Sequence, residues 1–334
     1  MSHKVVFFNL EPWGKDYILE STTLKAAGIG VGFEEHVLDS GHLPEDLNFD
    51  ILGVFVDSKV DAAAIAKLPN LKCVATLSTG FDHIDVAAAA ARGIVVSSVP
   101  SYGEQTVAEY AFALLLSLSR KVCEGRHRVR DEGKFTYEGL RGFDLAGKTI
   151  GIVGTGRIGR HAIMMAKGFG MKVIAFDVYK NDAFAKEVGF PYVSLEELLA
   201  QSDIISLHVP ATPETYHLLN EKTFPLVKRG AYLINTSRGP VIETMALVSA
   251  LKNGQLGGAG LDVLEEEAAL KRDGTAGHSD ATLKAIQELI AMPNVIITPH
   301  MAFNTKEAFL RILDTTIENI VNFTKGTPSN VVKP

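Results

Sequence analysis

The 334-residue sequence has little of what marks secreted, membrane-spanning or nucleic-acid-binding proteins. It has only two cysteines, Cys73 and Cys123, and neither belongs to a CxxC pair, so we expect a reducing compartment and no disulfide framework. No apolar run reaches the roughly 18 residues of a transmembrane helix, and the first residues lack the apolar core of a signal peptide. We therefore expect a soluble, cytoplasmic protein.

The sequence also lacks an excess of positive charge. Its formal net charge is -6 and its pI is near 5.9, which gives no electrostatic footprint for nucleic acid. One short basic cluster, residues 126–130, is interpreted as a solvated helix end. The ten histidines are scattered, and His36 and His42 lack a neighbouring cluster of cysteine or histidine, so we expect no metal site.

What the sequence does contain is enough apolar material for two sizeable cores. With 46% hydrophobic and 22% charged residues, a chain of this length builds about two globular domains. Short runs rich in Val, Ile and Phe alternate with helix-length segments, which favours an α/β fold with largely parallel sheets. In the first hundred residues we predict strands at 5–8, 51–56, 74–77 and 94–96, and helices at 19–27, 61–68 and 85–92.

A second series of strands begins at Thr149. Its six apolar runs, TIGIVG, KVIAFD, DIISLHV, AYLINT, GAGLDV and VIITPH, are the number that a complete doubly wound dinucleotide-binding sheet requires. Residues 106–122, between the two series, are predicted to form one long helix, and residues 305–323 an amphipathic helix. There is no low-complexity linker and no internal repeat.

The first strand of this second series runs straight into a glycine-rich turn, GTGRIG, which opens a helix-length segment. In this context the turn predicts a dinucleotide site. Gly154 permits the tight turn, Gly156 lets the backbone approach a pyrophosphate, and Gly159 lets the helix pack closely on the strand. Asp177 ends the next strand and can accept hydrogen bonds from ribose hydroxyls, which favours NAD over NADP, although Lys180 would soften that preference.

Polar residues stand at the carboxyl ends of the last three predicted strands, where open α/β sheets bind ligands. Arg238 offers a planar fork for a carboxylate, and His300 can pass a proton near neutral pH. A glutamate nearby would orient the histidine, but position does not choose among Glu265, Glu266 and Glu267. Each residue alone would also fit a structural role. Their conjunction on one sheet edge predicts reduction of a 2-oxo acid.

Seven motifs extend this pattern over essentially the full length: STGFDHID (78–85), VAEYAFALLL (107–116), GIVGTGRIGR (151–160), SLHVPATPET (206–215), LINTSRGPVI (233–242), GLDVLEEE (260–267) and ITPHMAFNT (297–305). As a set they resemble the D-isomer-specific 2-hydroxyacid dehydrogenase family, and within it the NAD-dependent D-lactate dehydrogenases. The resemblance implies that the catalytic glutamate stands five residues after the strand-end Asp262, which selects Glu267. It assigns acid/base work to His300 and the substrate carboxylate to Arg238.

The resemblance also implies further site residues. Around the substrate it places Thr79 and Gly80, through their backbone N–H groups, together with Tyr102 and Phe303. At the cofactor, with the glycines of the turn, it places Arg157, Ile158, Asp177, Val209, Pro210, Thr215, Thr236, Ser237 and Asp262. His208, which ends another predicted strand near the cofactor, is expected to be structural.

The same resemblance implies two doubly wound parallel-sheet domains. Residues 1–102 and 302–334 would form a flavodoxin-like substrate-binding domain, and residues 103–301 a Rossmann NAD-binding domain, with hinge closure that excludes water. We expect NAD as the cofactor, a small 2-oxo acid or D-2-hydroxy acid as the substrate, and a homodimer. No nucleic-acid or membrane partner is expected.

Two departures bear on the substrate. Asp57 stands where D-lactate dehydrogenases often have tyrosine, whereas Ala268 begins a longer insert that resembles the lactate subgroup. Hydroxypyruvate or glyoxylate reduction stays open because the three catalytic residues do not contact the tail of a 2-oxo acid. Phosphoglycerate and formate oxidation are disfavoured, the first because no basic cluster stands near Thr79 and the second because that branch uses a Gln-His pair. The alternative from another class is an NAD-sensing corepressor.

Overall fold

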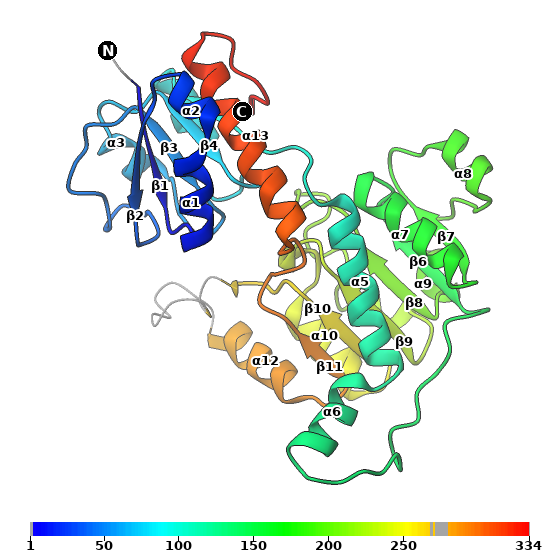
Figure 1. Cartoon of the computed structure of the whole chain (residues 1–334). Helices are drawn as coiled ribbons and strands as arrows, with labels where there is room; N and C mark the ends of the chain where they lie inside the picture. Colours follow the sequence, from blue (N-terminus) through cyan, green and yellow to red (C-terminus); the bar gives the residue numbers. More distant parts are fainter. Residues whose placement is uncertain (1–2, 268–269, 271–279, 334) are drawn as a thin grey trace. The chain divides into compact units, whose positions relative to one another are not determined.

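The computed structural model describes residues 3–267, 270 and 280–333. Contacts divide the chain into two compact units, Met1–Tyr102 with Thr305–Pro334, and Gly103–Asn304. Each unit is built on one parallel β-sheet flanked by helices (Figure 1). The predicted fold class, α/β with two doubly wound parallel sheets, is therefore confirmed.

The first unit contains a five-stranded sheet. Its strands are β1 (Lys4–Phe8), β2 (Gly30–Glu34), β3 (Ile51–Val54), β4 (Cys73–Thr76) and β5 (Val95–Ser97). All are parallel, in the flavodoxin-like order β2-β1-β3-β4-β5. Four correspond to predicted strands. The edge strand β2 does not, because its sequence, GVGFE, has two glycines and a glutamate instead of an apolar run.

The helices of the first unit are α1 (Pro12–Glu20), α2 (Thr22–Ala26), α3 (Ala62–Ala66), α4 (Val86–Ala91) and α13 (Lys306–Thr324). The predicted helix 19–27 has the wrong bounds. Ser21 separates α1 from α2, and its side chain caps α2 by accepting a hydrogen bond from the Leu24 N–H. The predicted terminal helix is confirmed as α13. It returns to this sheet, where the buried Asn319 donates to the Ser98 carbonyl at 2.9 Å.

The second unit contains a six-stranded sheet. Its strands are β6 (Thr149–Val153), β7 (Lys172–Phe176), β8 (Ile204–Leu207), β9 (Ala231–Asn235), β10 (Leu256–Leu261) and β11 (Val295–Ile297), which correspond to the six predicted runs. They are parallel, in the order β11-β10-β9-β8-β6-β7. Beyond β7, Tyr192 makes a single parallel bridge to Ala175. With that bridge as a vestigial strand, the order is that of a dinucleotide-binding sheet.

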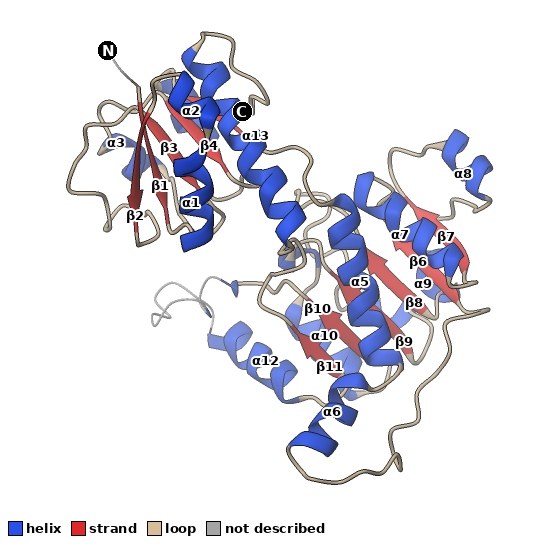
Figure 2. Cartoon of the chain, in the orientation of Figure 1, coloured by secondary structure: helices blue, strands red, loops and turns tan. Residues whose placement is uncertain are grey.

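The helices of the second unit are α5 (Glu104–Ser119), α6 (Val122–Arg130), α7 (Arg157–Gly168), α8 (Asp182–Val188), α9 (Leu195–Gln201), α10 (Thr244–Lys252) and α12 (Asp280–Ala291) (Figure 2). The predicted helix 106–122 corresponds to α5, which begins two residues earlier and ends three residues earlier, at Ser119. Lys121, with a left-handed φ of 54°, separates α5 from α6. None of the helices in the described parts of the chain is both long and apolar enough to cross a membrane.

Candidate active site

The glycine-rich turn joins β6 to α7 at the point where the strand order reverses, between β6 and β8. Gly154 has a φ of +93°, and a Cβ there would lie 2.6 Å from the His208 carbonyl oxygen, so glycine is required. A Cβ at Gly159 would lie 2.0 Å from the Gly154 oxygen, whereas one at Gly156 would meet nothing within 4 Å. Helix α7 begins without a side-chain cap, and helix N-termini of this kind bind phosphates, so the turn fits a dinucleotide.

Asp177 follows β7 and binds the glycine-rich turn. Its Oδ2 accepts hydrogen bonds from the N–H and hydroxyl of Thr155 at 2.6 and 2.9 Å, and its Oδ1 accepts one from the Tyr179 N–H at 2.8 Å. These bonds hold the carboxylate beside the turn and leave about one of its roughly four acceptor positions for a ribose hydroxyl. The ammonium of Lys180 lies 6.0 Å from the centre of the Tyr192 ring.

Further residues predicted at the cofactor lie at the start of α7 and in the loop after β8. Arg157 is the first residue of α7, and its guanidinium lies 3.6 Å from the carboxylate of Glu104 at the start of α5. Ile158 packs against the core under this helix. In the loop after β8, the Thr215 hydroxyl donates to the Pro210 carbonyl at 2.6 Å, which closes the loop that also carries Val209.

His208 follows β8, and its ring lies in the protein interior. Its Nε2 is 2.9 Å from the Ser206 hydroxyl, and its Nδ1 is buried without a hydrogen-bond partner among the described residues. The residue as a whole keeps some accessible surface, but the buried nitrogen decides its protonation. Burial lowers the pKa of His208 from 6.5 to about 4.

The buried ring of His208 predicts a loss of stability in acid. Above pH 6.5 the ring is neutral in the folded and unfolded chains, whereas between 6.5 and about 4 only the unfolded chain binds the proton. The free energy of unfolding should therefore fall by up to about 1.4 kcal/mol per pH unit, and by roughly 3 kcal/mol in all. Urea unfolding of the protein and of His208→Gln between pH 7 and pH 4.5 measures this contribution. Parallel pH curves for the two proteins would contradict it.

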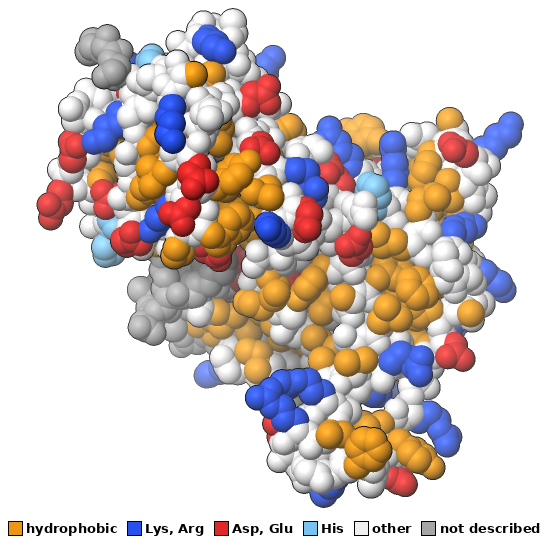
Figure 3. Space-filling view, in the orientation of Figure 1, with side chains coloured by type: hydrophobic (Ala, Val, Ile, Leu, Met, Phe, Trp, Pro, Cys, Tyr) orange, Lys and Arg blue, Asp and Glu red, His pale blue; other side chains and the backbone are white. Residues whose placement is uncertain are grey.

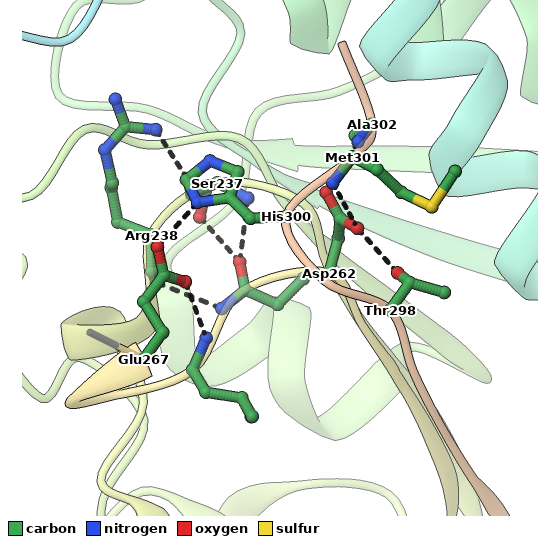
Figure 4. Close-up of polar contacts among 10 residues, drawn as sticks. Ser237, Arg238, Asp262, Glu267, Thr298, His300, Met301 and Ala302 are labelled. Atoms are coloured by element: carbon green, nitrogen blue, oxygen red, sulfur yellow. Dashed lines mark hydrogen bonds and ion pairs between the residues drawn. The ribbon is translucent and has the colours of Figure 1, made fainter. Parts of the chain in front are cut away.

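Arg238, Glu267 and His300 follow the adjacent strands β9, β10 and β11 at one edge of the sheet (Figure 4). His300 Nδ1 lies 2.6 Å from Glu267 Oε1, and the two side chains keep 20% and 30% of their surface accessible. No hydrogen bond within the described residues engages His300 Nε2, which leaves that nitrogen for a ligand. Arg238 is half-buried although it follows the buried strand β9, because it lies three residues beyond the end of that strand.

Asn235, at the end of β9, shapes the loop that carries Arg238. Its fully buried side chain accepts hydrogen bonds from the N–H and hydroxyl of Ser237, at 3.0 and 2.7 Å, and donates one to the Arg238 carbonyl at 3.0 Å. The neighbouring Thr236 is buried as well. Sequence reasoning did not single out Asn235. The available signal was an Asn two residues before a Ser at a strand end, which is a typical start of a side-chain-closed turn.

Asp262, at the end of β10, holds the segment that carries His300. Its oxygens accept hydrogen bonds from the Thr298 hydroxyl at 2.5 Å and from the N–H groups of Met301 and Ala302 at 3.0 and 2.7 Å (Figure 4). Burial raises the pKa of Asp262, and these hydrogen bonds partly offset that rise. The predicted contact of Asp262 with the cofactor stays a prediction, and the bonds described here make it a support for His300.

Among the three consecutive glutamates, Glu267 is bonded to His300. Glu265 instead lies 2.6 Å from His217 Nε2, and Glu266 between them has a left-handed φ of 52°. The turn at Glu266 sends the flanking glutamates to different partners, a feature that the spacing of residues along the sequence does not reveal.

Two predicted substrate residues lie in the first unit, after β4. The Thr79 hydroxyl donates to the Val99 carbonyl at 2.7 Å, and the Ser78 hydroxyl donates to the Gly80 carbonyl at 2.6 Å. The backbone N–H groups of Thr79 and Gly80 donate no hydrogen bond within the described residues. This loop is therefore held by its other polar groups, which leaves two N–H donors for a carboxylate.

The other predicted substrate residues belong to different units. Tyr102 is half-buried in the first unit, and its carbonyl accepts a hydrogen bond from Arg311 Nε at 2.6 Å. Phe303 is half-buried in the second unit. Asp57, which stands where tyrosine was expected, follows β3 and is also half-buried, so it does not simply face solvent. The first part of the insert that begins at Ala268, residues 268–269 and 271–279, lies outside the described residues, and its second part belongs to α12.

The fold and the site define the class first: a dinucleotide-binding α/β protein with a hydrogen-bonded histidine–glutamate pair at the edge of its sheet. The family model for "D-isomer specific 2-hydroxyacid dehydrogenase, NAD binding domain" matches residues 112–302. The chain belongs to this family, and it is an NAD-dependent D-2-hydroxyacid dehydrogenase. Within the described residues, no group of three or more His, Cys, Asp or Glu side chains could hold a metal ion.

Relatives with different printed activities resemble the chain. It is 36% identical to the D-lactate dehydrogenase of Escherichia coli over 330 residues, 97% of each chain. It is 40% identical to the glyoxylate reductase of Korarchaeum cryptofilum over 288 residues, 85% of this chain and 82% of the relative. The solved D-lactate dehydrogenase of Aquifex aeolicus, complexed with NAD and lactic acid, has a TM-score of 0.85 at 37% identity and covers 97% of this chain and 96% of its own.

Proposed function

We propose that the protein is a D-lactate dehydrogenase, which reduces pyruvate to D-lactate with NADH and catalyses the reverse reaction. The observation that carries the proposal is the 2.6 Å contact between His300 Nδ1 and Glu267 Oε1. These residues follow β11 and β10, and β10 pairs with β9, the strand that precedes Arg238. A histidine held at one nitrogen by a carboxylate presents the other nitrogen in a fixed direction, which suits proton transfer to a substrate oxygen.

Each of the three residues then has one role. Arg238 binds the substrate carboxylate through its planar fork. His300 Nε2 donates its proton to the carbonyl oxygen, and Glu267 orients the imidazole. Bound NADH supplies the hydride to C2. In the reverse direction, His300 accepts the hydroxyl proton of D-lactate.

The first unit is proposed as the substrate-binding domain and the second as the NAD-binding domain. In the first, the N–H groups of Thr79 and Gly80 would bind the substrate carboxylate, and Tyr102 would border the substrate. Phe303 of the second unit would also border the substrate. The cofactor would contact the glycine-rich turn and the predicted residues after β7, β8 and β9. The loop geometry at Gly154, Asp177 and Thr215 supports this assignment.

Pyruvate is proposed over its rivals because the match to a D-lactate dehydrogenase covers 97% of both chains. The glyoxylate reductase relative keeps glyoxylate and hydroxypyruvate as the alternative substrates. The test is kcat/KM with NADH for pyruvate, phenylpyruvate, 2-oxoisocaproate, hydroxypyruvate and glyoxylate. Pyruvate should rank first. A tenfold preference for glyoxylate or hydroxypyruvate would overturn the substrate assignment and leave the reaction class intact.

We also propose a homodimer and a cytoplasmic location. Helix α6 has no buried residue, and Phe135 and Tyr137, in the segment after it, are 93% and 84% exposed. Hydrophobic side chains gather on the surface near α6 (Figure 3), and exposure of this kind marks interaction sites. Light scattering after size exclusion should give about twice the 36.0 kDa of one chain, and a monomer at micromolar concentration would contradict this. The location is supported by two unpaired cysteines.

A further inference from the structure

We propose that Glu265 is a positioning residue, which ties together the three loops that carry Arg238, Glu267 and the predicted cofactor contacts after β8. The roles of these loops rest on the function proposed above. The ties themselves rest on hydrogen bonds within the second unit and do not depend on that function.

The carboxylate of Glu265 is bonded at both oxygens. Its Oε1 lies 2.6 Å from His217 Nε2, and its Oε2 accepts hydrogen bonds from the N–H and the hydroxyl of Thr244, at 2.7 and 2.6 Å. Its side chain is 15% accessible, so these bonds are shielded from bulk water and are worth more than surface contacts. Three hydrogen bonds from two residues hold this shielded carboxylate in a fixed arrangement.

The three bonded residues come from three separate loops. His217 lies in the loop after β8, two residues beyond Thr215. Thr244 begins α10, six residues after Arg238. Glu265 itself lies two residues before Glu267. One carboxylate therefore connects the segments that hold all three groups of proposed site residues.

Backbone contacts join the same loops. The His217 N–H donates to the Pro240 carbonyl at 2.8 Å, and a Cβ at Gly239 would lie 2.0 Å from the Leu264 carbonyl oxygen. The loop of Arg238 thus packs directly on the loop of Glu267. A substitution that displaces one of these two loops is therefore expected to displace the other.

The backbone around Glu265 also favours a fixed geometry. His217 and Glu266 have left-handed φ values of 49° and 52°, which residues with a Cβ adopt only where the surroundings hold them. Without the carboxylate of Glu265, the Thr244 N–H and the His217 ring lose their hydrogen-bond partner. The left-handed conformations of His217 and Glu266 then lose a contact that holds them. The turn that aims Glu267 at His300 would then relax.

The test compares Glu265→Ala with Glu265→Gln. For Glu265→Ala we expect kcat/KM for pyruvate to fall at least tenfold, the Kd for NADH to rise at least threefold, and amide hydrogen exchange to accelerate in residues 212–220 and 239–247. Glu265→Gln should stay within about threefold of the parent, because its amide oxygen can accept from Thr244 and its amide N–H can donate to a neutral His217. Thr244→Val, which removes only the hydroxyl, should lie between them and serves if Glu265→Ala does not fold.

Glu197→Ala is the matched control. Glu197 also holds a helix start in the second unit, by accepting from the Ser194 N–H at 3.0 Å at the beginning of α9, but it contacts none of the three loops. If Glu265→Ala and Thr244→Val match this control in NADH binding, turnover and exchange, the proposal is wrong. Cofactor affinity and exchange need no turnover. If the parent protein reduces no 2-oxo acid, the proposed function is wrong. NADH affinity and hydrogen exchange would still test the positioning role of Glu265.

Discussion

His300→Gln should lower kcat for pyruvate reduction by about 10²–10⁴-fold, the range that a positioned general acid contributes. Glutamine keeps a polar side chain of similar reach but has no proton to transfer at neutral pH. The bond of His300 Nδ1 to Glu267 shows how the ring is oriented, so the variant removes the chemistry at Nε2 more than the fold. NADH affinity should stay within about twofold, because the glycine-rich turn lies on other loops.

The control for this variant is His42→Gln, at an exposed histidine of the first unit whose side chain is 72% accessible. Steady-state kinetics at saturating pyruvate, with NADH binding followed by cofactor fluorescence, separates turnover from cofactor affinity. A kcat within tenfold of the parent would rule out His300 as the proton donor.

Arg238→Lys should lower kcat/KM for pyruvate by about 10- to 100-fold, with most of the loss in KM. A hydrogen bond to a charged group contributes roughly 1.5–3 kcal/mol, and lysine replaces the bidentate fork with a single ammonium. Arg238 starts from a defined place, because Asn235 holds its carbonyl and the backbone at Gly239 packs on Leu264. Because these contacts hold the loop, the lysine side chain cannot shift to recover the second hydrogen bond to the carboxylate.

Arg229→Lys provides the comparison, since Arg229 is an arginine of the same unit that donates to the Asn253 carbonyl at 2.9 Å, away from the predicted site. Kinetics across a pyruvate titration for both variants distinguishes a loss of substrate binding from a loss of turnover. An Arg238→Lys variant with the KM of the parent would remove Arg238 from the substrate carboxylate.

The strands of the fold could be predicted because parallel sheets covered on both faces require continuous apolar runs. All six strands of the second unit and four of the five in the first have such runs, and the glycine-rich turn stands where a tight backbone crossing demands glycine. The exceptions have identifiable causes. β2 is an edge strand whose sequence has two glycines and a glutamate, and Ser21 divides a run that has helical spacing throughout.

The candidate site was less accessible to sequence reasoning, because side-chain pairing depends on how the loops turn. The strand ends indicated Arg238 and His300, but the family resemblance was needed to choose Glu267 among three glutamates. The left-handed conformation of Glu266, which separates Glu265 from Glu267, has no signature in the sequence. The bonds of Asp262 and Glu265 likewise join residues that only the folded loops bring together. Those of Asn235 are local, to residues two and three positions further along the chain.

The most direct test is to incubate the purified protein with NADH and pyruvate, follow cofactor oxidation, and resolve the product on a chiral column. We predict rapid oxidation and a product that is D-lactate. L-lactate would contradict the D-lactate dehydrogenase function proposed here. Tight NADH binding with no turnover of any 2-oxo acid would contradict the catalytic function itself and favour an NAD-sensing protein.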